Sequence, residues 1–342
     1  MTQTVLIASP LELRHVERIR AVDRDVHVLY APELLPRTRY TADHMGAPFS
    51  RSPAQQERFL AMMAEADILW DLPTAEELAA AENLRWIQTT STGVGQSAAR
   101  LGLAARNILV TTARGVHARP LAEFTFMALL QHFRGLRHLH GEQLSHRWER
   151  YCGEEVAGRT LVIIGAGDLA RGCAKLAQAF EMRVIAVARD PARARLHNTL
   201  FDRIVDVSDL HAVLGAADAV VVTVPHTDAT DTMIDAAAIA AMRPGVALVN
   251  IARGQIIDED AMIAALRSNH IGFAALDVVR QEPLPPTSPL WDLPNVLISP
   301  HSASTVSAEN DRITEIFCHN LRCWLDGRLA NMRNILDQGL MY

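Results

Sequence analysis

Long apolar runs, a basic N-terminal segment and a strongly basic face are all missing from this sequence of 342 residues. The most apolar windows, such as Ala219 to Pro225 and Phe124 to Leu130, fall far short of the roughly 20 residues that span a bilayer. The N-terminus passes directly into the apolar stretch Val5 to Ala8, without a basic segment followed by a cleavable apolar region. We therefore expect a soluble, cytoplasmic protein with no membrane partner.

Cysteine and charge exclude further classes of protein. The four cysteines have no Cys-x-x-Cys spacing, and a chain of this length needs no disulfide staples. The formal net charge is −6 and the arginines are scattered or in short groups, so no basic stripe can neutralise a nucleic-acid backbone. The histidines, including His138 and His140, lack cysteines or carboxylates at ligand spacing. We expect reduced, mostly structural thiols, no metal and no nucleic-acid partner.

Short β-branched runs alternate with helical stretches along the chain, which predicts an α/β fold of parallel βα units. The first series is Val5–Ala8, Val26–Tyr30, Ile68–Asp71, Trp86–Thr90 and Ile108–Thr111. The second is Thr160–Ile164, Val184–Val187, Ala219–Val224, Val246–Ile251, Ile271–Leu276 and Val296–Ile298. At roughly 100 to 200 residues per domain, the length fits two domains. The six strands of the second series predict a doubly wound sheet.

Three helical segments bear on the domain organisation. Thr74 stands three residues before Glu77, the pattern of a capping box that starts a helix. Residues 118–140 form one longer helical pattern, which we expect to bridge the two halves of the chain. After Ser304 an amphipathic helix follows, with apolar residues three or four apart, and we expect it to pack against the first domain. The first domain is then discontinuous and the second is inserted into it.

A glycine-rich motif follows the first strand of the second series. The apolar run Leu161–Ile164 leads into Gly-x-Gly-x-x-Ala at Gly165, Gly167 and Ala170, and a helical stretch follows. Gly165 permits a tight turn, Gly167 lets a pyrophosphate approach the amides at the helix N-terminus, and Ala170 allows close helix packing. Taken alone, the motif is equally typical of an ordinary glycine turn. The series of strands around it favours dinucleotide binding.

The end of the next strand bears on the choice between NAD and NADP. An NAD site usually has Asp or Glu at this position, where the carboxylate binds the ribose hydroxyl, but here Ala188 occupies it. Arg189, with Arg193 and Arg195 nearby, suits a 2′-phosphate. The alternative is that these arginines form a solvated surface and that Asp190 contacts the ribose. The pattern favours NADP over NAD, with NAD left possible.

Three polar segments stand at the carboxyl ends of the later strands, where doubly wound sheets place their ligands. They are Asn250–Gly254, Asp277–Pro283 and Ser299–His301. Singly, such residues are usually surface charges or turn residues. Their common position at strand ends favours a shared site.

The chemistry that fits these segments is reduction of a 2-oxo acid. This reaction needs a cation for the substrate carboxylate, a proton donor for the developing alkoxide and a group that keeps the donor protonated. Arg253 offers a planar fork that matches a carboxylate. His301 titrates near neutrality, and a carboxylate such as Glu282 stabilises its imidazolium.

These motifs together resemble the D-isomer-specific 2-hydroxyacid dehydrogenase family, which includes glyoxylate/hydroxypyruvate reductases, phosphoglycerate dehydrogenase and formate dehydrogenase. The resemblance covers almost the whole chain. The matching segments are Ser91–Gly95, Pro120–Glu123, Gly165–Ala170, Pro225–Thr227, Asn250–Gly254, Asp277–Pro283 and Pro300–His301.

The resemblance implies a role for each site residue. Arg253, Glu282 and His301 take the catalytic positions, and the substrate carboxylate binds Arg253 and the backbone amides of the loop Thr92–Gly93–Val94. Asp277 matches a carboxylate near the nicotinamide. The cofactor contacts implied are Gly165, Gly167, Asp168, Leu169, Ala170, Arg189, Val224, Pro225, Thr230, Ile251, Ala252, Asp277 and His301.

The resemblance also implies the architecture. Residues 1–115 plus 305–342 form a flavodoxin-like substrate domain, and residues 116–304 form a dinucleotide-binding Rossmann domain. Family members are commonly homodimers through the nucleotide-binding domain. Aromatic candidates for the substrate pocket are His117, Trp148, Tyr151 and Trp291, and for each we favour packing in a core.

We therefore expect NAD(P)H-dependent reduction of a small 2-oxo acid to its D-2-hydroxy acid. Glyoxylate, hydroxypyruvate and a bulkier 2-oxo acid remain open as substrates. Formate oxidation is less favoured, because its additional polar residues and N-terminal extension are not found. Phosphoglycerate oxidation usually brings an extra regulatory domain. The alternative of another class is a dinucleotide-sensing interaction module, similar to a corepressor, without significant turnover.

Overall fold

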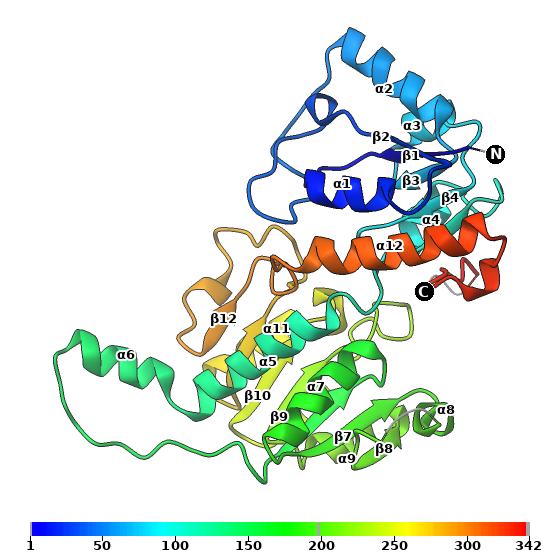
Figure 1. Ribbon diagram of the computed structural model, residues 1–342. Helices are drawn as coiled ribbons and strands as arrows, with labels where there is room; N and C mark the ends of the chain where they lie inside the picture. The colour runs from blue at the N-terminus through cyan, green and yellow to red at the C-terminus, as the bar shows by residue number, and fades with distance from the viewer. Residues whose placement is uncertain (1, 197–198, 340–342) are drawn as a thin grey trace. The chain divides into compact units, whose positions relative to one another are not determined.

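The computed structural model describes residues 2–196 and 199–339. The chain forms two compact units (Figure 1). Unit 1 consists of Met1–Val116 and Thr305–Tyr342, and unit 2 of His117–Ser304. Residues 340–342 of the predicted substrate domain lie outside the described residues. Assigning substrate binding to unit 1 stays a prediction.

Unit 1 is built on a five-stranded parallel sheet in the order β2-β1-β3-β4-β5. Its strands are β1 (Gln3–Ile7), β2 (Val26–Leu29), β3 (Ile68–Trp70), β4 (Trp86–Gln88) and β5 (Leu109–Thr111). Its helices are α1 (Leu13–Arg20), α2 (Pro53–Glu65), α3 (Ala75–Ala80), α4 (Gly95–Arg100) and α12 (Glu309–Leu325), with short 3₁₀ turns at Pro32–Leu34 and Leu329–Asn331. This strand order is the flavodoxin-like one, which reverses direction between β1 and β3.

Strand alternation in unit 1 directs apolar side chains to two buried layers. Leu6, Leu69 and Ile87 pack on one face with residues of α2 and α3, whereas Ile7 and Trp70 pack on the other face with α1 and α12. The α12 helix is amphipathic as predicted, and its fully buried apolar residues are Ile313, Phe317 and Leu321. The predicted capping box of α3 is present, with Glu77 N–H donating to Thr74 Oγ1 and Thr74 N–H to the Glu77 carboxylate.

Unit 2 contains a seven-stranded parallel sheet in the order β12-β11-β10-β9-β6-β7-β8. Its strands are β6 (Thr160–Ile164), β7 (Arg183–Ala188), β8 (Arg203–Asp206), β9 (Ala219–Val222), β10 (Val246–Asn250), β11 (Ile271–Leu276) and β12 (Val296–Ile298). Its helices are α5 (Ala118–Phe133), α6 (Leu136–Leu144), α7 (Asp168–Ala179), α8 (Pro191–Arg195), α9 (Leu210–Leu214), α10 (Ala236–Ala241) and α11 (Glu259–Arg267), with 3₁₀ turns at Val207–Asp209, Gly254–Ile256 and Pro289–Trp291. The order reverses between β6 and β9, as in a Rossmann fold.

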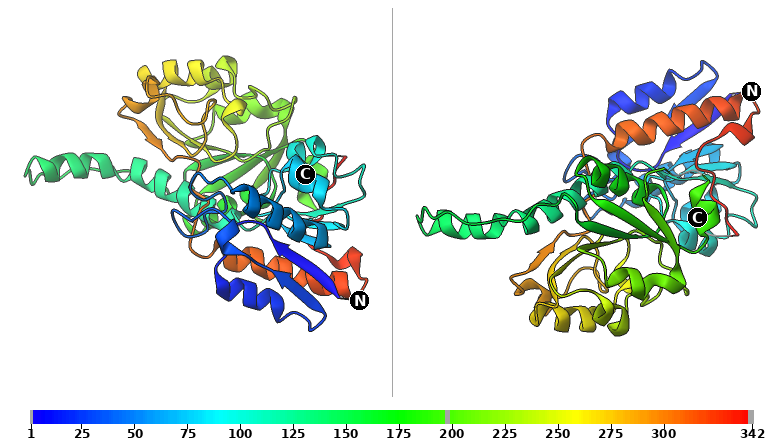
Figure 2. Two further views of the ribbon diagram at one scale, coloured as in Figure 1. Left: turned by 90° about the horizontal axis from the view of Figure 1, so that it is seen from above. Right: turned by 90° about the horizontal axis from the view of Figure 1, so that it is seen from below.

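Helices cover both faces of the unit 2 sheet (Figures 1 and 2). Leu161 and Ile163 of β6 pack with residues of α5 and α7, whereas Val162 and Ile164 pack with α9, α10 and α11. Such two-sided burial explains why the strands read as continuous apolar runs. The predicted fold, two Rossmann-like domains with doubly wound parallel sheets, is confirmed.

Two elements of unit 2 differ from the sequence prediction. The edge strand β8 was not among the six predicted strands. The helix predicted over residues 118–140 is two helices, because Gly135 adopts a left-handed conformation (φ +65°) between α5 and α6. Both helices belong to unit 2, and the expected bridge between the two halves stays a prediction.

The segment of residues 134–153, here called the arm, carries α6 away from the rest of unit 2 (Figure 2). None of the α6 residues is buried. The expected core packing of Trp148 is wrong, because this side chain is 99% exposed, and Tyr151 and Trp291 are also exposed. Among the described residues, no helix has the length and apolar character needed to cross a membrane.

Candidate active site

The glycine motif lies where the strand order of unit 2 reverses. Thr223, just after β9, donates through N–H and Oγ1 to the Ile164 carbonyl at 2.9 and 2.7 Å, which ties the ends of β6 and β9 together. Gly165 has φ +119°, and a Cβ there would lie 2.4 Å from Thr223 Oγ1. Glycine is therefore required at this turn on two independent grounds. Open α/β sheets bind ligands at such reversal points.

The N-terminus of α7 offers open space around Gly167. Gly167 is its N-cap, no side chain caps it, and a Cβ on Gly167 would meet nothing within 4 Å. Asp168 opens the helix, and its carboxylate pairs with Arg171 one turn later. Leu169 is half-buried and Ala170 is fully buried. These features fit a bound pyrophosphate, because helix N-terminal amides favour an anion.

The end of β7 carries the residues predicted to select the cofactor. Ala188 closes the strand, and Arg189 and Asp190 follow it, both exposed. The Asp190 carboxylate caps α8 by accepting from Arg193 N–H at 2.9 Å. Arg195 donates to the Ile204 carbonyl at 3.0 Å. Asp190 and Arg195 therefore have local structural partners, and Arg189 is the basic residue directly at the strand end.

The loop after β9 contains three predicted cofactor contacts. Val224 packs against the core, and Pro225 is exposed. Thr230 Oγ1 donates to the Pro225 carbonyl at 2.7 Å and accepts from Thr227 N–H at 2.8 Å, so this hydroxyl closes the loop. Its hydrogen bonds show a structural role for Thr230, and the contact with the cofactor stays a prediction.

A histidine and a carboxylate pair within the same loop. His226 Nε2 lies 2.8 Å from Asp231 Oδ1. This hydrogen bond holds the pKa of Asp231 below its usual value. Thr232 N–H donates to the Gln255 carbonyl at 2.9 Å, which joins the loop to the turn after β10. The pair stabilises the loop beside the predicted cofactor contacts.

The turn after β10 presents Arg253. Asn250 is 1% exposed; its Oδ1 accepts from Ala252 N–H at 3.1 Å and its Nδ2 donates to the Arg253 carbonyl at 3.0 Å. The side chains of Ile251 and Ala252 are buried, so these residues can meet a ligand only through their backbone. A Cβ on Gly254 would lie 2.0 Å from the Val279 carbonyl oxygen, so glycine is needed for this turn to pack against the loop after β11.

His301 and Glu282 are in direct contact at the carboxyl edge of the sheet. His301 Nδ1 lies 2.8 Å from Glu282 Oε2, and Glu282 Oε1 accepts from Val279 N–H at 3.2 Å. Both side chains are partly exposed, at 46% and 39%. Because the carboxylate accepts from Nδ1, Nε2 is the ring nitrogen that can face a substrate. The structure thus brings together the predicted proton donor and its carboxylate.

Asp277 lies next to this pair and is 3% exposed. Its Oδ1 accepts from Ser299 Oγ at 2.7 Å and from the N–H groups of Ser302 and Ala303 at 2.9 Å each. The sequence interpretation placed this residue only beside the cofactor. The structure adds an anchoring role for the loop that carries His301.

The predicted carboxylate-binding loop belongs to unit 1 and follows β4. Thr92 and Gly93 are exposed, and Val94 is buried as the N-cap of α4. Thr89 Oγ1 donates to the Ser91 carbonyl at 2.7 Å, which fixes the start of the loop. Exposed backbone at a strand end suits ligand binding, and the role of this loop stays a prediction.

Sequence reasoning missed Thr223, and it named Asn250 and Ser299 only as members of the predicted site segments, with no role of their own; all three shape these loops. Each is polar and stands at or just after the end of a β-strand. That position was the available signal. Among the described residues, no group of three or more His, Cys, Asp or Glu is arranged to hold a metal ion.

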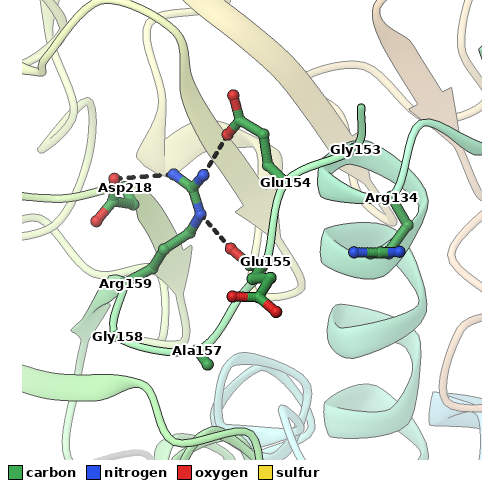
Figure 3. A pocket seen from close by; sticks show the side chains of 8 residues that line it. All are labelled: Arg134, Gly153, Glu154, Glu155, Ala157, Gly158, Arg159 and Asp218. Atoms are coloured by element: carbon green, nitrogen blue, oxygen red, sulfur yellow. Dashed lines mark hydrogen bonds and ion pairs between the residues drawn. The ribbon is translucent and has the colours of Figure 1, made fainter. Parts of the chain in front are cut away.

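A polar depression elsewhere on unit 2 is distinct from this site. It lies where β6 and β9 begin, the opposite edge of the sheet from Gly165 (Figure 3). Arg159 donates there to Asp218, at 3.2 Å, to Glu154 and to the Glu155 carbonyl. The charge of Arg159 is paired, and the cluster fixes the returning end of the arm to the sheet.

The comparisons with known proteins agree with one another. A family model described as D-isomer specific 2-hydroxyacid dehydrogenase, NAD binding domain, matches residues 126–303. The (S)-sulfolactate dehydrogenase of Chromohalobacter salexigens is 35% identical over 63% of this chain and 70% of that protein. The glyoxylate reductase of Thermofilum pendens is 31% identical over 81% of this chain and 84% of that protein. A crystal structure of a D-isomer specific 2-hydroxyacid dehydrogenase family protein from Aeromonas salmonicida matches with a TM-score of 0.81 at 28% identity, over 99% of this chain and 100% of that one.

Proposed function

This chain belongs to the D-isomer specific 2-hydroxyacid dehydrogenase family, and we propose that it reduces a small 2-oxo acid to the D-2-hydroxy acid. Members of the family are NAD(P)-dependent oxidoreductases that act on a CH–OH group, and this chain is such an enzyme. The relatives differ in substrate, since one is named for sulfolactate and another for glyoxylate. We propose glyoxylate, hydroxypyruvate or a similar small acid here.

The observation that carries the proposal is the contact between His301 and Glu282 at 2.8 Å. It lies at the carboxyl edge of the same sheet whose β6–α7 turn fits a dinucleotide. When bound at this turn, the nicotinamide cofactor would supply the hydride for the carbonyl carbon. His301 Nε2–H donates the proton to the carbonyl oxygen as negative charge develops there. Glu282 stabilises the imidazolium before that transfer and holds the ring tautomer.

Two groups are proposed to hold the substrate carboxylate. Arg253 has a planar fork that pairs with a carboxylate and polarises the adjacent carbonyl. Asn250 holds the Arg253 backbone, so the side chain starts from a fixed point. In unit 1, the amides of Thr92, Gly93 and Val94 are the second group, as the family resemblance implies.

We propose that the preferred cofactor is NADP(H). Ala188 leaves no carboxylate at the end of β7 to bind a ribose hydroxyl or to repel a 2′-phosphate. Arg189 follows directly, whereas the Asp190 carboxylate caps α8. Arg189→Ala should raise the Kd of NADPH roughly 10-fold or more, the loss expected for a charged hydrogen-bond pair, and leave that of NADH within about twofold. Arg183→Ala, at the exposed arginine that begins β7 at the end away from Arg189, is the control; equal effects of Arg189→Ala on both cofactors would contradict the assignment.

Turnover of a substrate panel tests the proposed function. Purified protein is given glyoxylate, hydroxypyruvate, pyruvate or phenylpyruvate with NADPH or NADH, and the loss of reduced nicotinamide absorbance is followed. We expect turnover with at least one small 2-oxo acid, faster with NADPH, and a D-configured product where the product is chiral. Tight dinucleotide binding without turnover of any acid would contradict the proposal and favour a dinucleotide-sensing module.

We further propose that the enzyme is a homodimer through the arm of unit 2. An isolated helix as short as α6 is marginal in water, so tertiary or partner contacts must stabilise it. Leu144 is 83% exposed and Trp148 is 99% exposed, which leaves apolar surface for a partner to cover. A second copy is the simplest occupant, since a twofold pair buries both arms at once.

The oligomeric state tests this arrangement. Leu144→Glu should shift the mass measured by light scattering from dimer to monomer. Leu13→Glu, at a leucine of α1 that is 64% exposed, should leave the mass unchanged. A wild-type chain that is monomeric at micromolar concentration would contradict the dimer.

A further inference from the structure

The backbone of His301 is held in a conformation that it would not adopt alone. Its φ is +52°, in the left-handed region that residues other than glycine rarely occupy. Such a conformation persists only where the surrounding structure imposes it. The side chain is 46% exposed, so core packing of the ring does not impose it. Hydrogen bonds to the loop backbone must therefore hold His301.

Asp277 supplies most of these hydrogen bonds. Its backbone carbonyl accepts from His301 N–H at 2.8 Å. Its Oδ1 accepts from the hydroxyl of Ser299, two residues before His301, and from the N–H groups of Ser302 and Ala303, directly after it. One residue thus grips the loop on both sides of the histidine.

Because the Asp277 side chain is buried, its carboxylate requires these hydrogen bonds to the loop. Asp277 is 3% exposed at the end of β11, and its own N–H donates to the Asn250 carbonyl at 3.0 Å. A buried carboxylate is costly unless donors compensate its charge. The three donors from residues 299–303 compensate the charge of the Asp277 carboxylate. Moving the loop would break these hydrogen bonds and leave a buried charge without donors.

We infer that Asp277 and Ser299 are positioning residues that fix the proton donor His301 in its left-handed conformation. The inference rests on the proposed role of His301 in proton donation. Two acidic residues then act on one histidine. The Glu282 carboxylate holds the ring, and Asp277 holds the loop, with its carbonyl on His301 N–H and its carboxylate on the neighbouring residues. All three loop donors meet Oδ1, so the anchor does not use Oδ2, and a cofactor contact by Asp277 is compatible with it.

Ser299 separates the anchoring role from any contact of Asp277 with the cofactor. Its hydroxyl donates to Asp277 Oδ1 at 2.7 Å, so Ser299→Ala weakens the anchor and keeps both carboxylates. Ser299→Thr keeps a hydroxyl and should restore activity. Ser268→Ala is the matched control, because Ser268 Oγ also makes one hydrogen bond, 3.0 Å to the Ala265 carbonyl at the end of α11.

The experiment compares these full-length variants with the acid that the wild type reduces best. Ser299→Ala should lower kcat roughly 10-fold, as expected for a misplaced catalytic group, with KM and the NADPH Kd within about twofold. The solvent deuterium isotope effect on kcat should rise, because proton transfer becomes slower relative to the other steps. Ser299→Thr and Ser268→Ala should match the wild type in both readouts.

Other outcomes separate the anchoring role of Asp277 and Ser299 from the proposed role of His301. A Ser299→Ala enzyme with unchanged kcat and isotope effect would overturn the anchor. So would a raised NADPH Kd as its only defect, which would leave Asp277 as a cofactor residue. His301→Ala is measured in parallel. If it turns over like the wild type, the proposed role of His301 as proton donor fails, whatever Ser299 does, whereas absence of turnover by the wild type overturns the proposed function itself.

Discussion

The carboxylate of Glu282 lies between His301 Nδ1, at 2.8 Å from Oε2, and the N–H of Val279, at 3.2 Å from Oε1. Both oxygens of the carboxylate therefore have partners, one on the imidazole ring of His301 and one on the backbone of its own loop. This arrangement fixes Nδ1 as the imidazole nitrogen that is hydrogen-bonded to the protein. The opposite nitrogen, Nε2, is the one assigned to proton donation.

Replacing the charge at Glu282 should slow the reaction without disturbing the loop. Glu282→Gln keeps the shape and an oxygen but loses the negative charge that stabilises the imidazolium, so kcat should fall roughly 10- to 100-fold. Steady-state kinetics with NADPH and the preferred acid measure it. Glu259→Gln is the control, because Glu259 also accepts a backbone N–H, from Arg280 at 3.0 Å. Equal activities of the two variants would contradict the role of Glu282.

Alanine substitutions at the two glycines of the dinucleotide motif should have different effects, one on stability and the other on cofactor affinity. Gly165→Ala places a Cβ 2.4 Å from Thr223 Oγ1 at a φ of +119°, so the melting temperature should drop. Gly167→Ala meets nothing within 4 Å at an ordinary φ of −79°, so stability should hold. If a pyrophosphate lies there, the NADPH Kd of Gly167→Ala should still rise about 10-fold or more. Calorimetry and nicotinamide fluorescence test both; unchanged NADPH affinity in Gly167→Ala would contradict the placement of the cofactor.

Acid should weaken unit 1 through Asp43. The Arg39 guanidinium donates two hydrogen bonds to this buried carboxylate, and the N–H groups of Arg39 and Gly46 donate two more. The side-chain bonds from Arg39 hold the pKa of Asp43 well below its usual range. A depressed pKa stabilises the fold at pH values above the unfolded pKa of about 4, and this contribution is lost as the pH falls towards the folded value.

Asp43→Asn should therefore destabilise the protein at pH 7, by about 1–3 kcal/mol for the lost charged hydrogen bonds, and by less at pH 3. Thermal unfolding at the two pH values measures the difference from the wild type. Asp292→Asn, at an exposed carboxylate, should show no such change. A gap between Asp43→Asn and wild type that is the same at both pH values would contradict this account.

Much of the fold was predictable because the parallel strands are buried on both faces of the sheet, and such strands consist of continuous apolar runs. The runs around Leu161–Ile164 and Val246–Asn250 are of this kind. Strand β8 was missed because it is a short edge strand with a charged residue at each end, Arg203 and Asp206, and only two β-branched residues between them. The break at Gly135 was missed because the helical pattern continues on both sides of a glycine whose left-handed conformation no pattern reveals.

The residue types of the candidate site were predictable, but the hydrogen bonds and backbone contacts that hold these residues in place were not. Arg253, Glu282 and His301 stand in motifs whose position at strand ends gives their chemistry. The anchors depend on contacts between loops: Asp277 meets Ser302 and Ala303 from 25 and 26 residues along the chain. Likewise, the need for glycine at Gly254 follows from the Val279 backbone that lies against it. Such pairings arise from the tertiary structure, and no local spacing encodes them.

The most direct test of the central claim is the rate of NADPH oxidation by wild type and His301→Ala with hydroxypyruvate and glyoxylate. Dinucleotide binding by both proteins is checked by nicotinamide fluorescence. The account predicts turnover by the wild type and a rate at least about 100-fold lower for His301→Ala, with binding unchanged, because the proton donor is lost. Equal rates for the two proteins would contradict the assignment of His301, and absence of turnover by a wild type that binds NADPH would contradict the reductase activity on these acids.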